Sequence, residues 1–355
     1  MRRLVRIGRL VFFWFIIVPL AKLRFRLRRV PKAELTINSP LTPIFKAVCF
    51  YVTFTRSLDA SHRRFIDDLM DLGVYVVLVS NHPAFDGHKA THAFVENKNV
   101  GKDIGGYKRT TEAFRNMYPE AAFPARILYA NDSVFYLGDK STLRGLLDET
   151  KGDWAGVIWN IGGVPHISSW LFAVSRRVFF DDMFVNFWRS YLPLDMKYWL
   201  IRRGEVGLTE VAVRMGITPS ALYGFESLLE VWDKTVEAVG PERAERMLSE
   251  EYGVYCRNLN LPSNTTRKNI AWLLAQISPY HLFQLIFLHQ RLCGFVKKDL
   301  FWHGRFLFSQ ADLIGSLVAQ HVGAEEAADM MGYYLRRGQL RYSPRRWAGE
   351  FFLVS

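Results

Sequence analysis

The chain of 355 residues is too long for one small module and suits one large α/β domain with an extension. Half of its residues are hydrophobic and 23% are charged, which supports a sizeable core and argues against disorder. The net charge is +12. Residues 1–33 contain ten basic side chains and no acidic one, so the rest of the chain has 36 basic and 34 acidic side chains. A body this close to neutral argues against nucleic acid as a partner. The three cysteines stand singly, so the sequence predicts no structural zinc cluster.

Residues 1–33 have the composition of a membrane-associating segment. The apolar run Leu10–Ala21 lies between two basic blocks, and at twelve residues, interrupted by Pro19, it is shorter than the ~20 residues of a spanning helix. The basic stretch Lys22–Arg29 that follows is a poor cleavage site for a signal peptide. We therefore predict peripheral or monotopic attachment to the anionic cytoplasmic face of the inner membrane. A buried N-terminal helix with a solvated basic flank is the alternative.

Residues 45–225 alternate between short apolar runs and helical stretches, a pattern that predicts an α/β domain. Prolines at positions 31, 40 and 43 indicate a linker before this domain. Beyond 225 strand signals disappear, so residues 226–355 are predicted to form a helical C-terminal region. Strands are expected at 74–79, 126–130, 157–159 and 170–174, and helices at 88–95, 110–117, 141–150 and 178–191.

Two loops have the composition of a phosphate or nucleotide site. The segment Asn99–Lys108 contains three glycines and is expected to open a helix, so its backbone N–H groups can approach a phosphate. Asn81 lies in a loop at the carboxyl end of the strand predicted over residues 74–79. The residues expected to bind the nucleotide in these two loops are Asn81, Asn99, Gly101, Asp103, Gly105, Gly106, Tyr107 and Lys108.

The triplet Asn131-Asp132-Ser133 follows the strand predicted over residues 126–130. A carboxylate at a strand end, flanked by short polar side chains, can hold a divalent cation such as Mg²⁺ or Mn²⁺ against a diphosphate. Asp132 is the expected metal ligand, with Asn131 and Ser133 beside the nucleotide. A simple turn is the alternative, because such turns are common for this composition.

Another enzyme class remains open at residues 80–86. This segment resembles the NHxxxxD box of glycerolipid acyltransferases, in which a histidine acts as base and an aspartate orients it. Only three residues separate His82 from Asp86, where the box needs four, and no acidic, glycine-rich second box follows. A lipid acyltransferase that uses His82 and Asp86 is therefore an alternative. Residues 208–222 have the spacing of a helix-turn-helix, which the neutral body argues against.

Several segments in succession resemble the rhamnan synthesis protein F-like glycosyltransferases of bacterial cell-surface polysaccharide assembly. The family pattern contains N-x-G-x-D-x-G-x-Y, N-D-S, an H-x-x-S-aromatic segment, F-x-x-F-W and E-V-x-L-T. Residues 294–300 also look like the family's P-F-I-K-R-E-L box, with Gly294 in place of proline. The resemblance covers roughly residues 70–305. The matching segments, in order, are residues 99–107, 131–133, 166–172, 184–188 and 205–209.

The resemblance implies a GT-A-like nucleotide-sugar domain at residues 45–225. Asn131–Ser133 would stand where such enzymes have a metal-binding D-x-D, although the first acidic position is an asparagine here. Glu205 matches the general base of inverting enzymes, with Asp132 as the other catalytic residue and His166 on the acceptor side. The implied hexosyltransferase moves a sugar, with rhamnose as first guess, from a dTDP-sugar donor to a polyprenyl-linked glycan acceptor. A non-catalytic membrane-bound assembly factor is the remaining alternative.

The position of Glu205 supports its role as general base. It follows Gly204, which allows close approach to a substrate, and it is expected to open a helix whose dipole keeps the carboxylate ionised. Glu210 lies about one and a half turns further on and is expected to point to another face.

Overall fold

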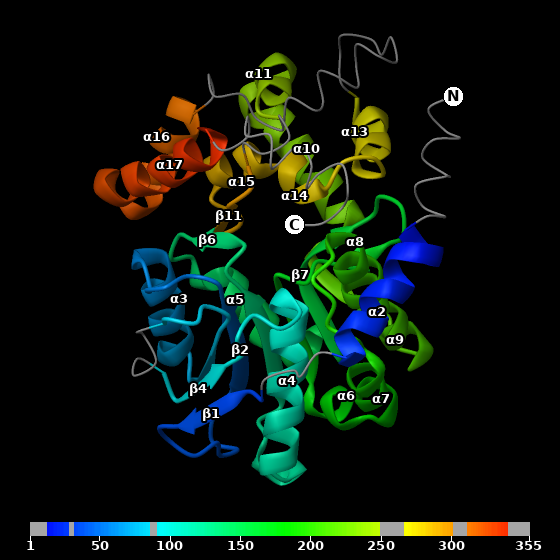
Figure 1. Ribbon diagram of the computed structural model, residues 1–355. Coiled ribbons are helices and arrows are strands. Elements are labelled where there is room, and N and C mark those ends of the chain that lie inside the picture. Colours follow the sequence, from blue (N-terminus) through cyan, green and yellow to red (C-terminus); the bar gives the residue numbers. More distant parts are fainter. Residues whose placement is uncertain (1–12, 28–31, 86–90, 249–265, 301–310, 340–355) are drawn as a thin grey trace.

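The structure is a computed structural model that describes residues 13–27, 32–85, 91–248, 266–300 and 311–339. Its centre is a nine-stranded sheet with helices on both faces, which confirms the predicted α/β class (Figure 1). The strands follow in the spatial order β1 (Glu34–Ile37), β4 (Ala93–Glu96), β3 (Val74–Ser80), β2 (Ala47–Thr53), β5 (Arg126–Asn131), β9 (Leu171–Ser175), β7 (Trp154–Asn160) and β10 (Ser220–Tyr223), and β8 (His166–Ile167) pairs with β7 off this path.

The strand order reverses between β2 and β5. Strands β4, β3, β2 and β5 are parallel, β9 is antiparallel to its neighbours β5 and β7, and β10 is parallel to β7. The chain passes outward from β2 to β3 and β4, and then returns to form β5 on the other side of β2. Open α/β sheets bind ligands outside the carboxyl ends of the strands at such a reversal. The fold therefore predicts a ligand site at the loops after β2 and β5.

Alternate residues of the central strands pack into two hydrophobic cores, one on each face of the sheet. In β2, Cys49 and Tyr51 belong to the first core, whereas Val48 and Phe50 belong to the second. Apolar side chains on both faces explain the uninterrupted apolar runs of these strands. The first core lies under α3 (Ala60–Asp71), α5 (Lys140–Leu147) and the C-terminal helices, and the second under α4 (Lys102–Met117), α6 (Arg176–Phe180), α7 (Asp182–Ser190) and α9 (Val206–Arg214).

The region after residue 225 is mostly helical, as predicted, but it also contains a strand. Strand β11 (Phe295–Lys297) pairs antiparallel with β6 (Val134–Tyr136), so the expectation of no strand beyond 225 was wrong. Three residues are too few to give a periodic signal. In Figure 1 the C-terminal helices gather with β6 and β11 at one end of the sheet. They are α10 (Phe225–Val239), α11 (Pro241–Arg246), α13 (Arg267–Leu274), α14 (Pro279–Leu282), α15 (Gln284–Gln290), α16 (Ala311–Val322) and α17 (Ala324–Gln339).

Other local predictions need correction. The helix expected at 88–95 is wrong, because residues 93–96 form β4, and residues 86–90 lie outside the described part. Part of the expected linker forms β1, which pairs with β4. The helix expected at 110–117 begins earlier, at Lys102, and the aromatic helix of 178–191 is two helices that meet at Asp181. Short helices also occur at η3 (Glu120–Ala122), η4 (Glu149–Lys151), α8 (Lys197–Trp199) and η5 (Leu200–Glu205).

The described part of the N-terminal segment is helical and has two different faces. It comprises η1 (Phe13–Ile17) and α2 (Val18–Leu27), and no helix in the described ranges is long and apolar enough to cross a membrane. Phe13 and Val18 are buried in the second core. Leu20, Leu23 and Leu27 are 59%, 55% and 78% exposed. One face therefore packs on the body, while the other presents apolar side chains to solvent.

Candidate functional site

The carboxyl ends of β2, β3 and β5 bring several of the predicted site residues to one edge of the sheet. Asn81 follows β3, and Asp132 follows β5 with its backbone N–H donating to Val52 of β2. The backbone N–H of Asn131 donates to Trp170, just before β9. This edge is the place where the strand order reverses, so the sequence triplet 131–133 occupies the position at which the fold itself favours a ligand.

The Asp132 carboxylate is held in a fixed position. Its Oδ2 accepts hydrogen bonds from Thr53 Oγ1 at 3.1 Å and from the Phe54 backbone N–H at 2.9 Å. The side chain is 11% exposed, and His62 Nε2 lies 3.7 Å from the same oxygen. Burial would raise the pKa of this carboxyl, but His62 and Lys298 outweigh burial and hold the pKa below its usual value. Asp132 is therefore ionised at neutral pH.

His62, which the sequence analysis missed, is a buried residue next to Asp132. It lies in the first turn of α3, is 1% exposed, and its Nδ1 is 2.5 Å from Oδ1 of Asp59, the N-cap of that helix. Burial would lower the pKa of His62, but the two flanking carboxylates, Asp132 and Asp59, raise it above its usual value. The His62 ring therefore lies between two carboxylates, hydrogen-bonded to Asp59 and within ion-pair distance of Asp132. The signal in the sequence was the cap spacing Asp59-x-x-His62.

Two lysines from the C-terminal region border the 131–133 turn. The Lys298 backbone N–H donates to the Ser133 carbonyl at 3.0 Å, and Lys297 Nζ lies 3.4 Å from Ser133 Oγ. The Lys297 ammonium also lies 5.6 Å from the centre of the Trp170 ring. Both lysines belong to the segment 294–300, which the sequence analysis identified without giving it a role. Pairing of β11 with β6 therefore brings positive charge to the end of β5.

Asp103 connects this end of β5 to the first turn of α4. Its Oδ2 accepts a hydrogen bond from the Asn131 side-chain amide at 2.9 Å, and its Oδ1 accepts from the Ile104 backbone N–H. Burial, with the negative charge of Glu205 nearby, raises the pKa of Asp103 to about 6. Asp103 is thus a carboxyl that changes its charge close to neutral pH, between the triplet and Glu205.

Glu205 lies on the far side of Asp103 and is bound by two polar side chains. Its Oε1 accepts from Ser169 Oγ at 3.0 Å, and its Oε2 lies 3.5 Å from His166 Nε2. The Nδ1 of His166 is 2.7 Å from the Val164 carbonyl, to which it must donate. Burial would lower the pKa of His166, but Glu205 and this carbonyl raise it. His166 and Glu205, predicted separately, therefore lie within ion-pair distance of each other.

The expected helix start at Glu205 is wrong. The helix begins at Lys197 and continues through η5 into α9, so Glu205 lies in its middle, at the end of a π-helical turn. The helix dipole acts within the first turn and does not reach this carboxylate. π-Helical turns recur at functional sites because they turn a side chain away from the regular helical position. Glu210 does point elsewhere, and pairs with Arg202 at 2.7 Å.

The three glycines at the start of α4 allow close packing of this helix. The Gly101 backbone N–H donates to Asp195 Oδ1 at 3.1 Å, so a carboxylate of the chain takes the position in which a phosphate was expected. A Cβ atom at Gly105 would lie 1.9 Å from the Val100 carbonyl, and one at Gly106 would lie 2.9 Å from Val52. These contacts account for the glycines without a ligand.

Of the remaining residues predicted to bind the nucleotide, some lie at the site and others do not. Asn81 is buried, and its side-chain amide donates to the Lys102 carbonyl, so it fixes the start of α4. Tyr107 is buried and donates to the Ser169 carbonyl at 3.0 Å, which places it under the site. Lys108 binds backbone carbonyls at the end of α7, away from the strand ends, and Asn99 is exposed.

The acyltransferase pair is described only in part. His82 lies in the loop after β3, where its Nδ1 accepts a hydrogen bond from the Ala84 backbone N–H at 3.2 Å. Asp86 lies outside the described residues. The helix-turn-helix alternative fails, because no second helix follows the turn: residues 217–219 are a loop and residues 220–222 belong to strand β10.

A divalent cation has one suitable ligand here. Within the described ranges no group of three or more histidine, cysteine, aspartate or glutamate side chains can hold a metal ion. Asp132 is ionised, and in this part of the chain its hydrogen bonds all go to Oδ2, which leaves Oδ1 for a ligand. Mg²⁺ bound by one carboxylate takes its other ligands from substrate phosphates and water. The residues therefore fit a cation that arrives with a diphosphate.

Comparison with known proteins finds a relative by sequence whose description states no activity. No family model matches the chain. The chain is similar to a protein of Sinorhizobium fredii described as "Uncharacterized protein y4gN", with 27% identity over 222 residues. The match covers 59% of this chain and 56% of the relative, so the chain spans little more than half of the relative's length. The geometry of the site must therefore carry the functional inference.

Proposed function

We propose that the protein is a glycosyltransferase that transfers a sugar from a nucleotide-sugar donor to a lipid-linked bacterial surface glycan. The observation that carries this proposal is the arrangement of Asp132 and Glu205 along one sheet edge. Asn131, next to Asp132, donates its backbone N–H to Trp170, and the preceding Ser169 donates to Glu205. The sheet order, in which β9 runs antiparallel between the strands β5 and β7, supports a GT-A-like domain.

The donor half of the site is the turn at residues 131–133. A departing nucleoside diphosphate carries negative charge, which Lys297 and Lys298 beside this turn can balance. Asp132 would hold a Mg²⁺ or Mn²⁺ ion against the same diphosphate, and that ion would neutralise charge on the leaving group. The His62–Asp59 pair keeps Asp132 ionised and in place.

The acceptor half is centred on Glu205. As the acceptor oxygen attacks the anomeric carbon, its proton passes to the Glu205 carboxylate, and the bond from that carbon to the diphosphate breaks on the opposite side. Ser169 and His166 orient the two carboxylate oxygens, so that the base does not need to reorganise during the reaction. The expected result is inversion at the anomeric carbon.

The exposed face of α2 supports attachment at the cytoplasmic face of the inner membrane. Leu20, Leu23 and Leu27 project to solvent beside basic residues of the same helix. Apolar anchors with positive charge suit an anionic lipid surface. Such attachment would place the enzyme beside a polyprenyl-linked acceptor.

Release of free nucleoside diphosphate tests the proposal. The full chain is incubated with a panel of nucleotide sugars that begins with dTDP-rhamnose, together with a prenyl-diphosphate-linked glycan. Glycosyl transfer predicts that one donor yields nucleoside diphosphate and a glycan heavier by one sugar. Release of thiol from an acyl-thioester donor would instead indicate an acyltransferase, and no turnover with any donor would favour an assembly factor.

A further inference from the structure

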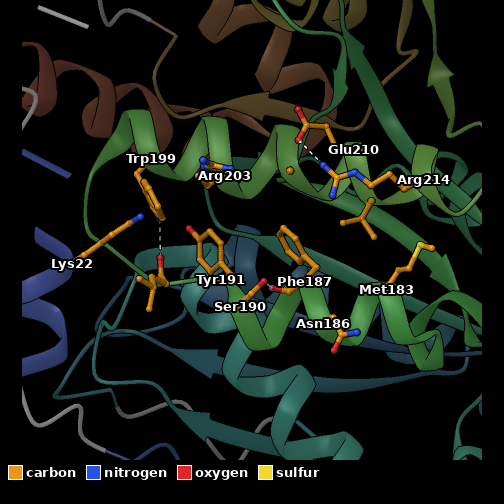
Figure 2. A pocket seen from close by; sticks show the side chains of 13 residues that line it. Lys22, Met183, Asn186, Phe187, Ser190, Tyr191, Trp199, Arg203, Glu210 and Arg214 are labelled. Atoms are coloured by element: carbon orange, nitrogen blue, oxygen red, sulfur yellow. Dashed lines mark hydrogen bonds and ion pairs between the residues drawn. The ribbon is translucent and has the colours of Figure 1, made fainter. Parts of the chain in front are cut away.

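A groove of 690 Å³ lies on the body beside the N-terminal helix, and none of the site residues described above lines it. It is formed by α2, α7 and the η5–α9 helix, and Figure 2 shows its lining side chains. Its size is within the range of sites for organic ligands of moderate size. Aromatic and aliphatic side chains, among them Phe187, Trp199 and Val211, make up much of its wall.

One end of the groove is cationic. Lys22 Nζ lies 5.1 Å from the centre of the Trp199 ring, and the Arg203 guanidinium carbon lies 5.8 Å from the same centre. Within the described ranges neither Lys22 nor Arg203 has a carboxylate partner. Figure 2 shows Arg214 at the opposite end, 3.9 Å from Glu210, a carboxylate that Arg214 shares with Arg202. The groove therefore combines an apolar wall with positive charge at one end.

Helix α2 contributes Lys22 to the lining of the groove. Lys22 lies one turn after the buried Val18, on the side of α2 that faces the body, whereas the exposed Leu20 and Leu23 lie on other sides of the helix. A ligand that suits both the apolar wall and the two cations of the groove has a negative head group and a hydrocarbon chain. A free anion would leave the aromatic wall unfilled, and a neutral hydrocarbon would leave the two cations without a partner.

We infer that this groove binds a single anionic phospholipid of the membrane, with its phosphate at Lys22 and Arg203 and an acyl chain along Trp199 and Phe187. The occupant is distinct from the reacting acceptor, because Glu210 lines the groove while Glu205, on the same helix, binds Ser169 and His166 instead. The lipid would hold α2 and the η5–α9 helix at the membrane surface. This inference goes beyond the proposed transferase activity and does not depend on it.

Binding of the full chain to mixed phosphatidylcholine and phosphatidylglycerol vesicles tests the charged end. The double variant Lys22→Gln/Arg203→Gln should bind roughly thirtyfold more weakly, since each basic residue near an anionic surface contributes about 1 kcal/mol. The control Arg243→Gln/Arg246→Gln removes the same charge from exposed positions of α11 and should stay within about twofold of the wild type. Equal losses in both variants would overturn the inference, because they would indicate unspecific attraction.

Filling the groove tests its apolar part without a change of charge. Ser190 is exposed and lines the groove, so Ser190→Phe should fill the groove without disturbing the core. Brominated phosphatidylglycerol should quench wild-type tryptophan fluorescence, and both Ser190→Phe and Trp199→Phe should lose a large part of that quenching. Quenching of Ser190→Phe equal to the wild type would overturn the inference, as would displacement of the lipid by inorganic phosphate alone. Thermal unfolding of each variant shows that it remains folded.

Discussion

The side-chain amide of Asn131 donates a 2.9 Å hydrogen bond to Asp103, and so joins the end of β5 to the first turn of α4. This contact gives a physical reason for the asparagine at the first position of the triplet. An aspartate there would place a second carboxylate against Asp103, which already feels the charge of Glu205. An amide can donate to Asp103 instead. The Asp103 carboxyl therefore explains why an asparagine stands at the first position of the D-x-D pattern.

Substitution of Asp103 by Asn should change how stability depends on pH. The pKa of this carboxyl is about 6 in the folded protein and 3.8 in the reference state, so the folded state keeps its proton while the unfolded chain has lost it. Stability therefore falls as the pH rises from about 4 to 6, and the loss is about 2–3 kcal/mol at neutral pH. Asp103→Asn should be more stable relative to the wild type at pH 7 than at pH 4. Urea unfolding at both pH values measures this, and parallel pH curves for the two proteins would contradict it.

The Asp132→Asn variant should lose donor turnover by about 10²–10³-fold and remain folded. Asparagine can keep the contact with Thr53, but it lacks the charge that a cation beside a diphosphate requires. Initial rates of nucleoside diphosphate release, with and without chelator, provide the measurement. Activity that neither the chelator nor the substitution affects would remove Asp132 from the reaction.

The Glu205→Gln variant should keep donor affinity and lose about 10²–10⁴-fold in turnover, because glutamine retains the shape but not the basicity. Glu210→Gln is the matched control, since Glu210 lies on the same helix and pairs with Arg202 outside the site. Turnover and donor binding are measured for both variants. Similar turnover of the two would show that another carboxylate is the base, and Asp182 would be tested next.

His62→Gln should destabilise the protein mainly at lower pH. The pKa of His62 is raised, because Asp132 and Asp59 outweigh its burial. The charged form therefore stabilises the fold fully below about pH 6.5, and this stabilisation is lost as the pH rises through the folded pKa. The cost of the substitution should be about 1–3 kcal/mol at pH 6 and smaller at pH 9. His289→Gln, at an exposed position, serves as control, and a cost for His62→Gln that does not vary with pH would contradict the charged pair.

The strands and their ends could be predicted from the sequence because burial on both faces leaves an uninterrupted apolar run. Residues 74–79 and 126–130 carried that signal, and the polar triplet after the second run lies at the reversal of strand order. The π-helical turn at Glu205 could not be predicted in this way, since a regular helical period does not distinguish it.

The supporting residues were missed because they come from distant parts of the chain. His62 lies on α3, far from Asp132 in sequence, and Lys297 reaches Ser133 only through the pairing of β11 with β6. Local sequence patterns do not indicate that residues from distant parts of the chain come together in the fold. The glycines of α4 show the opposite case, since a pattern typical of phosphate loops serves helix packing here.

The most direct test of the proposed activity is the mass of the products formed from a nucleotide-sugar panel by the wild type, Glu205→Gln and Glu210→Gln. The proposal predicts that the wild type and Glu210→Gln release the nucleoside diphosphate of one donor and lengthen the prenyl-linked glycan by one sugar, while Glu205→Gln does so far more slowly. A wild-type protein that transfers no sugar from any donor, or a Glu205→Gln variant as active as Glu210→Gln, would contradict it.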